Sequence, residues 1–256
     1  MENTENRNNP LWLSRLDCNY QLDDTSIDIW LCNAENMLSQ SDYFFSILSA
    51  NEQVRALRFK FDTHRNRFII SHGFTRCVLA KYLQVTPADI KYKKEQLGKP
   101  YLSDINKSAL TFNLSHTEDI SILAVAKYSQ LGIDIEYKNR KTDWQAISQK
   151  FYTHSEKKSL SAIKNENHQK QAFYELWTRK EAYMKVIGTG LSLPPTGFSL
   201  SVPPASPILI KHHFKKYNID QVIEFNELVM PATLVDYCAT LASNSLKSKI
   251  KHYLFD

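Results

Sequence analysis

The stretch Gly132-Ile133-Asp134-Ile135-Glu136 alternates apolar and acidic side chains, which predicts a β-strand with two different faces. Because alternate residues of a strand point to the same side, Asp134 and Glu136 would project together, roughly 7 Å apart, while Ile133 and Ile135 enter a core. Neighbouring carboxylates suit Mg²⁺, which prefers oxygen ligands. By itself, this alternation is also typical of a half-buried strand with one wet face.

A second stretch, WTRKEAYMK at residues 177–185, has the composition of a helix. Glu181 would add a third carboxylate to the cation, and a diphosphate would complete its octahedral coordination. Lys180 and Lys185 would then meet the phosphate charge. The spacing of Glu181 and Lys185 also fits a surface helical ion pair, which contributes about 0.2–0.5 kcal/mol and needs no catalytic role.

Together the two stretches resemble the signature of the 4′-phosphopantetheinyl transferases of the Sfp type, in which a G-[IV]-D-[IV]-E strand precedes a W-[ST]-x-K-E-[AS]-[FY]-x-K helix. The resemblance extends over about residues 55–198 through GKPY at 98–101, FNLSHT at 112–117 and GTGLSLP at 188–194. It implies an enzyme that transfers the phosphopantetheine arm of coenzyme A to a serine of an apo acyl, peptidyl or aryl carrier protein. The second product would be adenosine 3′,5′-bisphosphate.

The resemblance also implies roles for individual residues. Asp134, Glu136 and Glu181 would bind Mg²⁺, with Mn²⁺ as a substitute. The catalytic residues would be Glu181, as metal ligand, base or both, together with Lys185 and a protonated His116. Coenzyme A, the co-substrate, would be bound by Arg55, Arg67, Lys99, Pro100, Ser115, His116, Lys180 and Lys185.

One position departs from the family. Its members often carry two basic residues one turn apart near the start of the first helix, and this chain has Glu52 and Arg55 there. A carboxylate beside a phosphate would weaken binding. Either Glu52 points away, the local alignment is shifted, or the 3′-phosphate of the nucleotide is held differently.

The order of elements predicts an α+β fold. We expect a disordered tail at residues 1–9 and a polar loop at 165–170. Strands are expected at 26–31, 111–114, 120–128, 132–137 and near 235–241, and helices from about residue 49, at 65–83, within 144–163 and at 172–186. The resemblance adds two similar α/β halves in pseudo-twofold arrangement, residues 10–128 contacting coenzyme A and 129–256 binding metal and carrier, with the active site in the cleft between them.

The composition limits the class of protein. The chain has 256 residues and a net charge of +5, a mild excess that does not indicate a nucleic-acid binder. Its four cysteines include no C-x-x-C pair, which favours a reducing compartment. No signal peptide or apolar run of membrane-spanning length is visible. We therefore expect a soluble cytoplasmic protein, free of membrane, and by analogy with two-half relatives a monomer.

Two other functions remain open at this stage. A magnesium-dependent phosphohydrolase of nucleotide diphosphates could use the same three carboxylates with water as the nucleophile. A non-catalytic carrier-binding module could keep the fold after losing its chemistry. The sequence does not say whether the carrier serves fatty acid, polyketide or nonribosomal peptide biosynthesis, nor whether acyl-coenzyme A is accepted.

Overall fold

The computed structural model describes residues 11–15, 18–103, 109–188, 192–205, 208, 210–213, 222–245 and 248–256. The tail expected at residues 1–9 and residues 189–191 of the GTGLSLP stretch lie outside the described residues. The described part is a mixed α+β fold with two larger sheets and two short hairpins. None of its helices combines the length and apolarity that crossing a bilayer requires.

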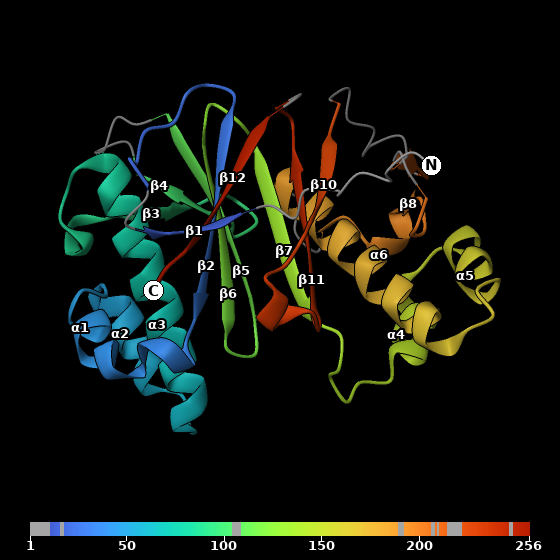
Figure 1. Ribbon diagram of the computed structural model, residues 1–256, viewed down its shortest axis with the longest axis horizontal. Helices are drawn as coiled ribbons and strands as arrows, with labels where there is room; N and C mark the ends of the chain where they lie inside the picture. Colours follow the sequence, from blue (N-terminus) through green and yellow to red (C-terminus); the bar gives the residue numbers. More distant parts are fainter. Residues whose placement is uncertain are drawn as a thin grey trace, which may run out of the picture.

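The first large sheet has five strands in the order β1-β12-β2-β6-β5 (Figure 1). β12 pairs in parallel with both β1 and β2, while β2, β6 and β5 are antiparallel. The sheet therefore combines strands from both ends of the chain. The bounds of its strands are Trp12–Ser14 (β1), Ser26–Asn33 (β2), Leu110–Thr117 (β5), Ile120–Lys127 (β6) and Lys249–Leu254 (β12).

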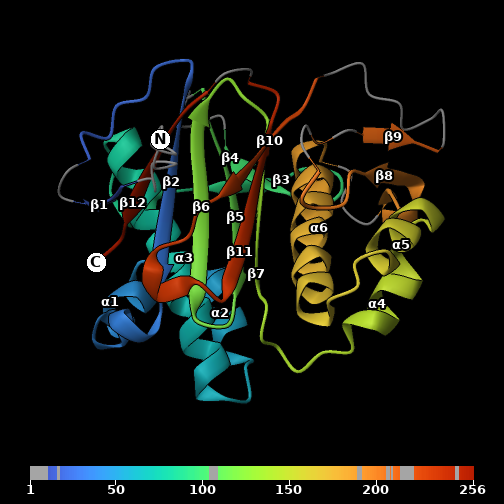
Figure 2. The same cartoon turned by 45° about the vertical axis from the view of Figure 1, so that its right-hand side comes forward.

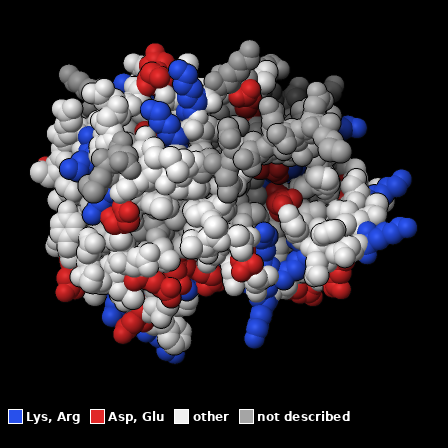
Figure 3. All heavy atoms as spheres, viewed as in Figure 1, with Lys and Arg blue, Asp and Glu red and all other residues white. Residues whose placement is uncertain are grey.

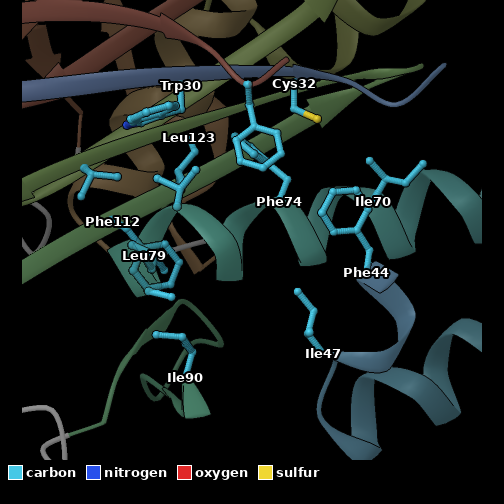
Figure 4. Close-up of a cluster of buried hydrophobic side chains, with 14 of the residues drawn as sticks. Trp30, Cys32, Phe44, Ile47, Ile70, Phe74, Leu79, Ile90, Phe112 and Leu123 are labelled. Carbon is cyan, nitrogen blue, oxygen red and sulfur yellow. The ribbon is translucent and has the colours of Figure 1, made fainter. Parts of the chain in front are cut away.

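Helix α3 (Asp62–Leu83) covers one face of this sheet. Its buried Ile70, Phe74 and Leu79 pack against Trp30 of β2 and Leu123 of β6 (Figure 4). The shorter helices α1 (Ser41–Ser46) and α2 (Ala50–Leu57) pack against α3. This packing fixes the position of α3 on the sheet.

The second large sheet has the antiparallel order β10-β11-β7, with β10 at Glu224–Leu228, β11 at Tyr237–Ser243 and β7 at Leu131–Tyr137. Helix α6 (Glu166–Val186) lies against β7 and β11, with α4 (Trp144–Phe151) and α5 (His154–Ser161) beyond it (Figure 2). Short hairpins are β3–β4 (Tyr92–Lys94, Pro100–Leu102) and β8–β9 (Phe198–Leu200, Ile210–His212).

Gly132 lets α6 approach β7 directly. A Cβ atom at this position would lie 2.0 Å from the carbonyl oxygen of Ala182 and 2.4 Å from the amide nitrogen of Val186. Any side chain would therefore push the helix away from the strand. The glycine of the GIDIE stretch thus sets the distance between the acidic strand and the helix that carries Glu181 and Lys185.

The two large sheets share a core and meet along β5 and β7. Ile29, Ile122, Ile133 and Leu241 from four strands are all fully buried in that core. β5 and β7 lie side by side at the junction. On the face seen in Figure 3, acidic and basic side chains are interspersed, and neither sign covers it.

Most expected elements are confirmed, and two expectations are wrong. The loop expected at 165–170 is the start of α6, because Asn165 caps the helix and accepts a hydrogen bond from the His168 amide. The lysine-rich segment at residues 249–251, for which no strand was expected, begins β12 of the first sheet, with Lys249 and Lys251 still exposed. Lys180, expected to face phosphate, is completely buried. The division of the chain at residue 129 remains a prediction. β12 lies after residue 129 in the sequence but belongs to the first sheet.

Candidate active site

Asp134 lies at the junction of the two sheets. Its side chain is nearly inaccessible to solvent, and Oδ1 accepts hydrogen bonds from Lys185 Nζ at 2.7 Å and Ser115 Oγ at 2.8 Å. Lys185 Nζ also donates to the Ile133 carbonyl oxygen at 2.9 Å. Oδ2 is buried and has no hydrogen-bond partner among the described residues. A bound cation or water would satisfy a buried carboxylate oxygen in this state.

Glu136 and Glu181 share the electrostatic environment of Asp134. Burial and the negative charge of Asp134 raise the pKa of Glu136 to about 7, although Arg140 opposes the shift. Burial and Asp134 also raise the pKa of Glu181 to about 6, opposed by Lys185. Like charges disfavour one another's ionised form when they are close and poorly solvated. The three carboxylates therefore form one acidic cluster that a cation would stabilise.

β5 and β7 lie side by side but belong to different sheets. Side chains of β5 form hydrogen bonds to β7. Asn113 Oδ1 accepts a hydrogen bond from the Ile133 amide at 2.8 Å, and Ser115 Oγ donates to Asp134. Thr117 Oγ1 makes a long contact of 3.5 Å with Glu136 Oε2. These three positions alternate along β5 and so face β7 together. The FNLSHT stretch thus orients both carboxylates of β7.

His116 lies between them on β5 and points to the other side. Its side chain reaches solvent, but nearby protein atoms remove enough water to lower its pKa, and His72, Lys185 and Arg55 lower it further. The imidazole is therefore mainly neutral at pH 7 in the unliganded protein. The expectation of a protonated His116 concerns the site with phosphate bound and stays a prediction.

Glu52 points away from His116, into the contact between α2 and α3. Its carboxylate accepts hydrogen bonds from Ser49, from Arg76 at 2.6 Å and contacts His72 Nδ1 at 3.0 Å. Burial opposes ionisation, but these partners lower the pKa of Glu52 to about 2. Of the three explanations for the family departure, the first therefore fits. Arg55 lies one turn on, with its guanidinium 5.0 Å from the Phe68 ring.

Other residues expected at the site already have partners. Arg67 pairs with Asp119 at 2.6 Å and with Glu118 at 3.0 Å. Lys99 Nζ donates to the carbonyl oxygens of Leu131 at 2.9 Å and Lys185 at 2.7 Å, and so ties its loop to the start of β7 and the end of α6. The Lys99 side chain thus binds backbone carbonyl groups of two other segments. The coenzyme roles of Arg67, Lys99 and the exposed Pro100 remain predictions.

Lys180 does not join the acidic cluster. Its Nζ donates to Glu156 Oε1 at 2.7 Å and to the Phe198 carbonyl oxygen at 2.9 Å. Both members of this ion pair are buried, and Lys180 has no exposed surface. Its expected contact with phosphate is therefore wrong for this structure, because the ammonium group is enclosed between α5, α6 and β8.

The donor set of the acidic cluster fits magnesium. No group of three or more His, Cys, Asp or Glu side chains in the described part of the chain is close enough to enclose a metal ion. Mg²⁺ usually needs only one or two protein carboxylates and takes substrate phosphates and water as its other ligands. The Oδ2 atom of Asp134, which has no hydrogen-bond partner among the described residues, is available as one such ligand.

Sequence reasoning did not foresee several of these contacts. The bond from Ser115 to Asp134 and the bond from the Ile133 amide to Asn113 connect residues about twenty positions apart. The polar residues at alternate positions of FNLSHT were the sequence feature that could have indicated these contacts. The approach of α6 to Gly132 had a weaker signal, a glycine within an otherwise good strand.

Comparisons with known proteins identify the family of the chain. The family model of the 4′-phosphopantetheinyl transferase superfamily matches residues 130–242, and the N-terminal model of 4′-phosphopantetheinyl transferase matches residues 35–128. The transferase HetI of Nostoc sp. is 36% identical over 167 residues, which cover 65% of this chain and 70% of HetI. Sfp of Bacillus subtilis is 30% identical over 161 residues, which cover 63% of this chain and 69% of Sfp.

Among solved structures, the holo-(acyl-carrier-protein) synthase from Bacillus anthracis in complex with CoA (3′,5′-ADP) matches 40% of this chain and 93% of its own, at 21% identity and a TM-score of 0.33. That likeness is too low to support an argument. The family models and the curated relatives suffice: the chain belongs to the 4′-phosphopantetheinyl transferase superfamily.

Proposed function

We propose that the protein transfers the 4′-phosphopantetheine arm of coenzyme A to a serine of an apo carrier protein and releases adenosine 3′,5′-bisphosphate. The family and its curated relatives, which are named as 4′-phosphopantetheinyl transferases, support this reaction. The observation that carries the assignment to particular residues is the buried Asp134. It has one oxygen bound to Lys185 and Ser115 and the other without a partner.

Asp134, Glu136 and Glu181 would hold Mg²⁺, or Mn²⁺ in its place. When bound there, the ion would neutralise part of the diphosphate charge and help align it. The raised pKa values of Glu136 and Glu181 support this role, because burial and the charge of Asp134 outweigh the nearby cations Arg140 and Lys185, and a bound cation would favour the ionised forms. Lys185 forms its ion pair with Asp134 Oδ1 and acts on Glu136 and Glu181 only through longer-range attraction.

The reaction forms a bond from the serine oxygen to the phosphorus next to pantetheine and breaks the bond from that phosphorus to the bridging oxygen. The nucleotide leaves with the electron pair. Glu181, with a pKa of about 6, is largely ionised above pH 7 and would accept the serine proton. A positioned base contributes typically 10²–10⁴ in rate, whereas enzymes commonly reach 10⁶ or more. Charge stabilisation by Lys185 and His116 would therefore supply part of the remainder.

The nucleotide end of coenzyme A would lie toward α2 and the outer side of β5. Arg55, His72 and Lys185 are close enough to His116 to lower its pKa, so positive groups converge there. Phosphate would reverse this shift and protonate His116. Ser115 would act mainly by orienting Asp134 and Lys185. Arg67, Lys99 and Pro100 remain candidates for contacts around this end.

The remaining expectations are also part of the proposal. The chain would form two similar halves with the site between them, and the two family models, which meet near residue 129, support that division. We further propose a monomer that works in the cytoplasm on carriers of fatty acid, polyketide or nonribosomal peptide synthesis. The four free cysteines are consistent with a reducing compartment.

A nucleotide-release assay separates transfer from hydrolysis. The protein is incubated with coenzyme A and Mg²⁺, with and without an apo carrier protein, and adenosine 3′,5′-bisphosphate is quantified by chromatography. We expect release only when the carrier is present. Equal release without carrier would identify a phosphohydrolase. No release with any carrier, but retained carrier binding, would identify a non-catalytic module.

A further inference from the structure

A cavity of about 750 Å³ lies on another part of the molecule. It opens between the C-terminal half of α3, the end of β1, the start of α1 and the chain terminus, and its lining includes none of the residues assigned to transfer. Arg67 and His72, by contrast, lie in the N-terminal half of α3. The volume is within the range of about 300–1,000 Å³ that is typical of small-molecule sites.

Two positive side chains line this cavity. Burial raises the pKa of the Cys77 thiol there, but Arg15 and Lys81 both act to lower it, so both cations lie near the same sulfur. Neither forms an ion pair with a carboxylate of a described residue. Lys81 is in the last turn of α3, where the helix dipole favours a cation. The helix dipole does not explain Arg15, whose guanidinium lies 5.0 Å from the centre of the Phe255 ring.

The rest of the lining is largely apolar. Phe44 and Phe255 form buried walls, and Tyr43 and Val85 at the rim are 49% and 40% exposed. Figure 4 shows Phe44 packed beside α3 near Ile70 and Phe74. The polar groups Tyr20, Gln40 and Gln84 complete it. Apolar walls with two cations lacking carboxylate partners are complementary to a molecule with an apolar body and one negative charge.

We propose that this cavity binds a small aliphatic monocarboxylate, with its carboxylate at Arg15 and Lys81 and its chain against Tyr43, Val85 and Phe255. Charge-assisted hydrogen bonds from the guanidinium would fix the head group. Each buried methylene group adds hydrophobic stabilisation, so affinity should rise about threefold to fourfold per methylene until the cavity is filled. The site is independent of the transfer reaction.

Calorimetric titration of the full-length protein with hexanoate, octanoate and decanoate tests this proposal. We expect one site per chain, with affinity that increases from hexanoate to octanoate. Arg15→Gln should weaken octanoate binding at least about tenfold, and Lys81→Gln several-fold, because each removes one of the two positive charges. The matched control Lys158→Gln removes an exposed lysine of α5 and should leave the affinity unchanged.

Three further arms make the proposal falsifiable. Val85→Glu, at an exposed rim position, places a negative charge at the mouth and should abolish octanoate binding without unfolding the protein, as checked by circular dichroism. Octanol, which has the same chain without the charge, should bind much more weakly. Added coenzyme A should not compete. No binding of any carboxylate, equal binding by the Arg15 variant and the wild type, or displacement by coenzyme A would each overturn the proposal.

Discussion

Replacing Lys180 by methionine should destabilise the protein strongly and leave coenzyme A recognition intact. Glu156 keeps three further hydrogen bonds, from the Thr153 amide at 2.8 Å, the Thr153 hydroxyl at 3.0 Å and the Leu200 amide at 2.9 Å. The substitution removes the only cation that contacts Glu156 among the described residues. Breaking such a buried pair by removing one partner costs about 3–5 kcal/mol, because the other charge stays buried and uncompensated.

The change should be visible in thermal unfolding. For a chain of this size, about 1 kcal/mol corresponds to about 2–4 °C in Tm, so the Lys180→Met variant should melt about 6–20 °C lower. The double variant with Glu156→Gln should recover part of the loss, since glutamine removes the buried charge but can still accept a hydrogen bond. Lys158→Met, at an exposed position of α5, is the matched control and should shift Tm little.

Kinetics then separate the structural role from contact with substrate. At a temperature where all variants are folded, the KM for coenzyme A should stay within about twofold of the wild type, because a structural residue acts mainly on the folded fraction. A variant with unchanged Tm and a KM raised tenfold or more would refute this reasoning. It would mean that Lys180 leaves Glu156 to bind phosphate.

Three other substitutions or titrations test the site. Glu52→Gln should destabilise the protein at pH 7 and less in acid. The folded pKa of Glu52 is lowered to about 2 from an ordinary 4.5, so its contribution of about 3 kcal/mol is present above pH 4.5 and lost as the pH falls toward 2. Urea unfolding at pH 7 and pH 3.5 measures the difference between variant and wild type, and a pH-independent difference would contradict the assignment. NMR titration of His116 should give a pKa below the ordinary 6.5 in the free protein and a higher one with adenosine 3′,5′-bisphosphate bound, whereas no increase would exclude contact with phosphate. Ser115→Ala should cost about 1–3 kcal/mol, measured by urea unfolding, because Asp134 and Lys185 each lose a buried partner. Ser115→Thr keeps the hydroxyl and is its control, and an equal loss in both variants would point to side-chain packing.

The local parts of the fold were predictable from the sequence. The alternation in GIDIE and the apolar spacing of the helix that carries Glu181 reflect periods of two and 3.6 residues, which the chain shows directly. Ser49 with Glu52 three residues later is a capping-box pattern, and the structure contains that box. The grouping of Asp134, Glu136 and Glu181 followed from the family signature rather than from periodicity.

The missed parts depend on partners that are distant in sequence. β12 has a lysine-rich sequence that looks like surface, and only pairing with β1 and β2 makes it an inner strand. The burial of Lys180 depends on Glu156, which lies on another helix. Asn165 was a usable helix-start signal, but the polar residues that follow it concealed the first turns of α6.

The central claim is that Asp134 and Glu181 serve phosphopantetheine transfer at the junction of the two sheets. The most direct test is the intact mass of an apo carrier protein after incubation with coenzyme A, Mg²⁺ and the wild-type protein, Asp134→Ala or Glu181→Ala. We predict a gain of one phosphopantetheine group with the wild type and loss of that gain with both variants, each checked to be folded. A full gain with the Asp134 variant at saturating Mg²⁺, or no gain with the wild type on several unrelated carriers, would contradict the account.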